Sequence, residues 1–155
     1  MENKKLLLVE DEPFLAKVIE EDQKLFPKDA YRMLFIDNHD ENSWQGTVKS
    51  RFGKGYQTFA VLVYTLPGMP LMYSGQESNL DKSLRFFEKD TINFKDFPLA
   101  KFYTALNTLK HRHPALANGA AGGSFTLISN TQPEQILSFA RNTDKDKIVV
   151  MVNLS

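Results

Sequence analysis

The feature that most constrains this chain is a change of pattern near residue 114. Before it, short apolar runs alternate with helical patterns, and after it three strand patterns follow one another without a helix between them. Alternating strands and helices are typical of parallel βαβ units, whereas consecutive strands are typical of an antiparallel meander. The sequence therefore predicts an α/β chain to which an antiparallel sheet is appended.

The individual elements are predicted from apolar spacing and from turn residues. We expect early strands at residues 5–9, 32–36 and 70–73, and helices at 14–23, 53–66 and 98–114. We expect the final strands at 124–129, 135–141 and 147–154. The polar segment 37–46 and the long stretch 76–97 have no period and are predicted to be loops. A loop as long as the second one is often functional.

Composition narrows the classes of function. The 155 residues are 42% hydrophobic and 25% charged, as in a soluble globular protein. Lys+Arg and Asp+Glu both number 19, so no charge excess indicates nucleic acid or a membrane surface, and there is no cysteine for disulfides or thiolate metal sites. The start lacks a signal-peptide pattern and no apolar run suits a membrane helix, so we expect a cytoplasmic chain. A secreted or periplasmic parent protein is the alternative.

The strongest candidate for chemistry is the segment FIDNHD at residues 35–40. It places the amide of Asn38, the imidazole of His39 and the carboxylate of Asp40 just past a predicted strand. In α/β barrels, side chains from several strands converge at that end. Groups that donate and accept hydrogen bonds in fixed directions suit a polyhydroxylated ligand. A polar loop in which Asn and Asp cap a turn is the alternative interpretation.

Longer motifs around this segment resemble the α-amylase family (family 13) of glycoside hydrolases. RMLFIDNHDENSWQG resembles the fourth conserved region, and LPGMPLMYSGQE resembles the last barrel strand with its loop. RFFEKDTINF and FYTALNTLKHRHPAL resemble the eighth helix region, while ILSFARN and KDKIVVMVNLS resemble the first strands of the all-β C-terminal domain. The resemblance covers about residues 22–155, in the family's order and spacing.

This resemblance implies a fold. Residues 22–117 would be the C-terminal part of a (β/α)₈ catalytic barrel, and residues 118–155 a truncated all-β C-terminal domain. A complete barrel typically needs about 250 residues, so the chain is expected to hold only a partial one. We expect its last two βα units, one further βα unit at the N-terminus, and then the first antiparallel strands of the second domain.

The resemblance also implies roles for single residues. Asp40 matches the aspartate that stabilises the oxocarbenium-like transition state, and His39 matches a histidine that hydrogen-bonds the same sugar. Asn38 precedes that histidine and is expected to be more structural than catalytic. Glu77, after the last barrel strand, is expected to orient the site. Trp44 is expected either to offer an aromatic face to a sugar ring or to pack on the barrel rim.

Two groups that the family's chemistry needs are not found in this sequence. Retaining glycosidases use a nucleophile and an acid/base, two carboxyl groups about 5–5.5 Å apart. In the family these lie on barrel strands 4 and 5, before anything that matches here. We therefore expect the chain alone to be inactive, to bind an α-glucan or maltooligosaccharide weakly, and to self-associate through open sheet edges. The resemblance leaves hydrolase and transglycosylase open.

The first residues resemble a different family. KKLLLVEDEP, within the matching stretch 4–16, resembles the first strand and acidic turn of a response-regulator receiver domain, so residues 1–21 are predicted to be a receiver-like strand and helix. Glu10 and Asp11 would match the acidic pair that holds Mg²⁺, although two carboxylates alone hold that ion poorly. The alternatives for the chain are a chimera, a designed βα scaffold, a receiver-like signalling module without catalytic activity and a diverged amylase fragment.

Other candidate sites are interpreted as structural. The parent family allows a Ca²⁺ ion, and Asp37, Asp40 and Glu41 are oxygen ligands, but solvated loop carboxylates are the favoured interpretation. His111 and His113 lie two apart near a helix end and do not share a helix face for a metal. We expect both to interact with the helix dipole and solvent. No cofactor is predicted.

Overall fold

The computed structural model describes residues 12–155, with side chains from Leu15 onward. The predicted strand 5–9 and the residues Glu10 and Asp11 lie outside the described part. In chain order the elements are α1 (Glu12–Leu25), β1 (Met33–Leu34), α2 (His39–Trp44), α3 (Val48–Phe52), a 3₁₀ turn (Gly53–Gly55), α4 (Tyr56–Thr65), β2 (Met69–Pro70), α5 (Ala100–Arg112), two more 3₁₀ turns (Pro114–Leu116 and Gly119–Ala121), β3 (Ser124–Leu127), β4 (Ile136–Asn142) and β5 (Lys147–Asn153).

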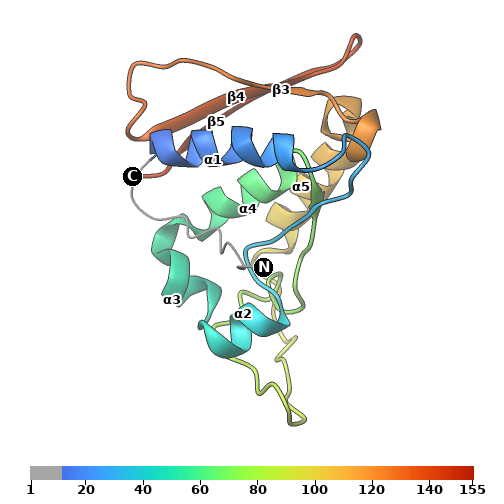
Figure 1. Cartoon of the computed structure of the whole chain (residues 1–155). Helices are drawn as coiled ribbons and strands as arrows, with labels where there is room; N and C mark the ends of the chain where they lie inside the picture. The colour runs from blue at the N-terminus through green and yellow to red at the C-terminus, as the bar shows by residue number, and fades with distance from the viewer. Residues whose placement is uncertain (1–11) are drawn as a thin grey trace.

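The strands form two separate sheets. β1 and β2 pair in parallel, with Met33 opposite Met69, and helices α2 to α4 connect them. β3, β4 and β5 form an antiparallel meander in that order, which α1 crosses on one face (Figure 1). The predicted change from parallel βαβ structure to an antiparallel sheet is thereby confirmed.

The two parallel strands are shorter than the sequence predicts. Arg32 and Leu34 accept from the amides of Met69 and Leu71, at 2.7 and 2.8 Å, and within residues 12–155 each strand has one neighbour. A strand that is hydrogen-bonded on one side only ends early, which explains why β1 and β2 are shorter than the predicted strands 32–36 and 70–73. At Gly68 (φ 155°) a Cβ would lie 2.8 Å from Leu34, so β2 approaches β1 only where a glycine stands.

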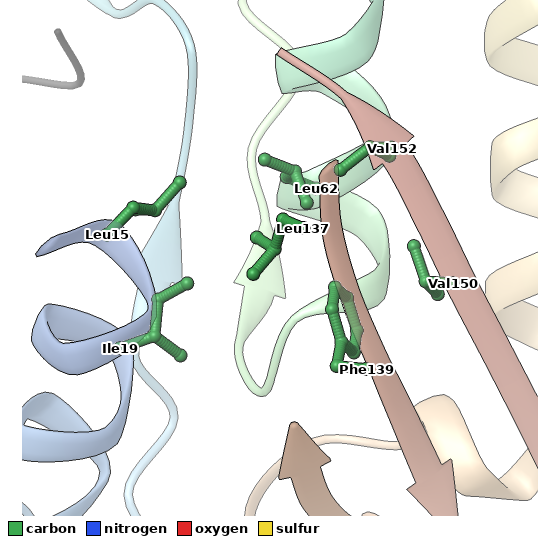
Figure 2. Close-up of a cluster of buried hydrophobic side chains, with 7 residues drawn as sticks. All are labelled: Leu15, Ile19, Leu62, Leu137, Phe139, Val150 and Val152. Atoms are coloured by element: carbon green, nitrogen blue, oxygen red, sulfur yellow. The ribbon is translucent and has the colours of Figure 1, made fainter. Parts of the chain in front are cut away.

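Helix α4 lies between two hydrophobic cores. The first core is made by α1, α4 and the antiparallel sheet, and comprises Leu15, Ile19, Leu62, Leu137, Phe139, Val150 and Val152 (Figure 2). The second is made by the segment after β1 and by α3, α4 and α5, and comprises Ile36, Val48, Ala60, Val63, Tyr64, Tyr103 and Leu106. Because α4 has side chains in both, it is apolar on two faces rather than on one stripe. The first core joins residues on both sides of position 117.

A buried arginine connects the antiparallel sheet to α4. Arg141 is 1% exposed, and its guanidinium donates to the carbonyl of Thr65 at 3.0 Å and to that of Gly123 at 3.2 Å. Burial lowers the pKa of Arg141 to about 10. Thr65 ends α4, where unpaired carbonyls and the helix dipole favour a cation. Arg141 therefore fixes the sheet against the carboxyl end of α4.

The prediction of an irregular loop at 37–46 is wrong, because α2 begins inside it. The side chain of Asn38 accepts from the amide of Glu41 at 2.8 Å, which is an N-cap, and acidic Asp40 and Glu41 suit the first turn. Six residues are too few to show a helical period. The predicted helices 14–23, 53–66 and 98–114 are confirmed with shifted ends as α1, α4 and α5, whereas α3 was not predicted. Residues 76–97 form the loop at the bottom of Figure 1.

Candidate functional site

The predicted site residues lie at the turn from β1 into α2. Asn38 has extended backbone and caps the helix, so its side chain is used structurally. The side chains of His39 and Asp40 are 68% and 58% exposed, and His39 Nε2 lies 3.7 Å from Asp40 Oδ1. An imidazole and a carboxylate are thus exposed after a parallel strand, where they can hydrogen-bond hydroxyl groups of a ligand.

A buried ion pair beneath this turn holds it in place. Arg51 Nη2 donates to Asp37 Oδ1 at 2.5 Å and to the carbonyl of Ile36 at 2.8 Å, while Nη1 lies 3.3 Å from Glu41. Burial raises the pKa of Asp37 to about 6, against the opposing charge of Arg51. Sequence reasoning missed Arg51, because its partners are up to 15 residues away and no motif marks the pair.

Asn42 joins α2 to the long loop that follows β2. Its side chain is 2% exposed, donates to Asp37 at 3.2 Å and to the carbonyl of Lys82 at 3.3 Å, and accepts from the amide of Leu84 at 2.7 Å. A buried amide with its hydrogen bonds satisfied fixes the segments that it joins. The loop around residues 82–84 is therefore held against α2, although 40 residues separate it from Asn42.

The same loop is also fixed internally. Asp90 pairs with the ammonium of Lys82 and accepts from the backbone amide of Arg85 at 3.1 Å. The ammonium of Lys82, followed by the amides of Thr91 and Arg85, lowers the pKa of Asp90 to about 2. The segment from 82 to 91 is therefore held together by the carboxylate of Asp90, which stays ionised at neutral pH.

The two remaining predicted site residues, Trp44 and Glu77, have different partners. Trp44 ends α2 with 60% of its surface exposed, and its ring lies 5.4 Å from that of Phe86 in the long loop. Glu77 Oε2 accepts from the amide of Gly75 at 3.1 Å, so it braces its own loop. Sequence reasoning missed Phe86 and its neighbour Phe87, although the length of the loop was a signal that it carries function.

The other candidates have structural partners. For His113 the sequence predicts interaction with the helix dipole and solvent; in the structure its Nδ1 lies 3.1 Å from Asp146, which also accepts from the amide of Ala115 at 3.0 Å. Asp37 and Glu41 face Arg51. Between residues 12 and 155 no three His, Asp or Glu side chains gather as metal ligands. Nor does the described part of the chain contain a helix long and apolar enough to cross a bilayer.

Solved structures with the same fold are enzymes of the α-amylase type. A maltogenic α-amylase from Thermotoga neapolitana matches with a TM-score of 0.74 and 20% identity, over 92% of this chain and 33% of that one. A cyclomaltodextrinase matches with a TM-score of 0.76 and 20% identity, over 94% of this chain and 25% of that one. The fold is therefore that of one portion of such enzymes, which combine a (β/α)₈ barrel with an all-β C-terminal domain.

The relatives found by sequence are also amylases. The chain is 29% identical over 131 residues to an α-amylase, MalA, from Haloarcula japonica, and 28% identical over 129 residues to a β/α-amylase from Paenibacillus polymyxa. These matches cover 83% and 79% of this chain but 19% and 10% of the relatives' lengths. No protein-family model matches the sequence. Relatives of the α-amylase family thus cover most of the chain, which spans a fifth or less of these two relatives.

Proposed function

We propose that this chain is a segment of an α-glucan-processing glycoside hydrolase of the α-amylase family. Residues 22–117 would belong to the catalytic barrel and residues 118–155 to the C-terminal domain. The observation that carries the proposal is the placement of His39 and Asp40, which stand exposed at the carboxyl end of parallel strand β1. The α-amylase relatives over most of the chain support the substrate class.

The proposed roles follow from the positions of the side chains. Asp40 would offer a carboxylate to the positive charge that develops on the sugar ring in an oxocarbenium-like transition state. His39 would hydrogen-bond a hydroxyl of the same sugar. Asn38 would act by holding the first turn of α2, since its side chain is committed to the amide of Glu41. The nucleophile and the acid/base would have to come from elsewhere in a longer protein, so the 155-residue chain alone would bind without hydrolysing.

Two measurements on the purified chain test this proposal. Calorimetric titration with maltoheptaose should give weak, saturable binding that Asp40→Asn reduces by about fivefold or more, as expected for the loss of a charge-assisted hydrogen bond. Asp144→Asn, at an exposed turn remote in sequence, is the matched control and should bind as the parent does. Glucan binding that Asp40→Asn leaves unchanged would refute the proposed site.

Hydrolysis is the second measurement. A chromogenic maltooligosaccharide should release no product above the buffer rate, because removal of both catalytic carboxyl groups leaves little beyond binding. Turnover by this chain that Asp40→Ala abolishes would contradict the proposed dependence on carboxylates from outside it.

A further inference from the structure

A small cavity lies behind the candidate site, lined by residues from α2, α3 and the loop that follows β2. The lining includes the polar side chains of Asp37, Asn42, Lys49, Ser74 and Gln76. The centre of a water molecule can occupy about 20 Å³ of this cavity. Because one water needs about 10–15 Å³ of such space, the cavity has room for a water molecule and is too small for an organic ligand.

Gln76 brings a buried donor without a partner to this cavity. The residue is 8% exposed, so its side chain is more than nine-tenths buried. Its Oε1 accepts from the backbone amide of Tyr73 at 3.2 Å, which fixes the orientation of the side-chain amide. Among the described residues, Gln76 Nε2 has no hydrogen-bond partner. A buried donor left in this state is strongly disfavoured, so an acceptor is expected in the cavity.

Asp37 lines the same cavity and can accept one more hydrogen bond. This carboxylate is 3% exposed and accepts from the guanidinium of Arg51, from the side chain of Asn42 at 3.2 Å and from the backbone amide of Asn38. An ionised carboxylate offers about four acceptor positions. Three are used, and the fourth is available to a donor inside the cavity.

These two groups restrict the kind of ligand that fits between them. The amide donor of Gln76 disfavours a cation, since its hydrogens carry partial positive charge. The carboxylate of Asp37 disfavours an anion. Water both accepts and donates, and a buried water needs two to four polar partners. Gln76, Asp37 and the hydroxyl of Ser74 provide them.

We propose that this cavity binds one ordered water molecule, which accepts a hydrogen bond from Gln76 Nε2 and donates one to the carboxylate of Asp37. The water joins the loop after β2 to the buried ion pair of Asp37 and Arg51. It adds a second link between these segments to the one that Asn42 makes with residues 82–84. The inference concerns groups inside the fold and does not depend on the proposed glucan substrate.

A high-resolution crystal structure of the 155-residue chain tests the site directly. We expect a density peak about 2.7–3.2 Å from both Gln76 Nε2 and a carboxylate oxygen of Asp37. Absence of a peak, or a Gln76 amide whose Nε2 donates to a protein group, would overturn the proposal. A peak that contacts oxygens at about 2.3–2.6 Å would be a bound cation and would overturn the assignment of water.

Oxygen-17 relaxation dispersion of the solvent tests the site in solution, because it counts the water molecules that tumble with the protein. Gln76→Met removes the donor while keeping the length of the side chain, and should lower the count by one relative to the unsubstituted chain. Gln57→Met is the matched control, since Gln57 is exposed on α4, and should leave the count unchanged. Equal counts in all three proteins would contradict the proposal.

Circular dichroism shows whether Gln76→Met retains the fold. If this variant does not fold, the crystal structure of the unsubstituted chain still decides between the outcomes, because it needs no substitution.

Discussion

Replacing Ile19 by alanine tests whether α1 is an integral part of the fold. Ile19 is 5% exposed and packs, together with Leu15, on the antiparallel sheet, in the core that α4 also enters (Figure 2). The change removes three side-chain carbon atoms at about 0.8 kcal/mol each, and the cavity left behind adds to this cost. We expect the free energy of unfolding to fall by about 3 kcal/mol. For a chain of 155 residues this lowers Tm by roughly 6–12 °C.

Thermal unfolding followed by circular dichroism measures the effect, with urea titration for the free energy. Ile19→Val is expected to cost about 1 kcal/mol, because it removes one methylene. Lys17→Ala is the control on the same helix, since its side chain is 71% exposed and its ion pair with Glu21 at 3.9 Å contributes little. A Tm for Ile19→Ala within about 2 °C of the Lys17→Ala value would refute the packing of α1 on the sheet.

Two further predictions concern the buried pair beneath the candidate site. Arg51→Met should lower the free energy of unfolding at pH 7.5 by about 3 kcal/mol or more, because it leaves the buried carboxylate of Asp37 without its ion-pair partner. Urea titration should show a smaller loss at pH 4.5, where Asp37 is protonated. An equal loss at both pH values would contradict this prediction. In the unsubstituted chain the raised pKa of Asp37 means that this carboxyl group binds its proton more tightly in the folded state than in the unfolded state. The contribution of Asp37 to the free energy of unfolding should therefore decline by on the order of 2–3 kcal/mol as pH rises from about 4 to 6. Asp37→Asn should remove that part of the pH dependence.

The elements predicted correctly are those whose pattern repeats several times. Helix α5 presents an apolar stripe over thirteen residues, and β4 and β5 follow strand patterns of seven residues each, so local spacing identified all three. Helix α2 has six residues and α3 has five, which is too short for a period to appear. Their capping residues, Asn38 and Thr47, were the available signal, since each accepts from an amide three residues further along the chain.

The residues of the candidate site also differ in whether a local sequence pattern could identify them. Asn38, His39 and Asp40 are adjacent in sequence, so a motif was enough to identify them and a strand end was enough to place them. Arg51, Asn42 and Phe86 each have a partner between 14 and 47 residues away, and nothing local distinguishes them from other polar or apolar residues. Their roles depend on which segments the fold brings together.

The sequence by itself determined the order of strands and helices, the polar triplet after β1 and the length of the loop after β2. These are local properties, because they depend on side-chain spacing and backbone preferences within a few residues. Only the tertiary structure decided that α4 is buried on two faces, that Asp37 is buried deeply enough for its pKa to rise, and that Phe86 lies against His39. Burial and contact at these positions are produced by segments distant along the chain, so they arise only once the chain has folded.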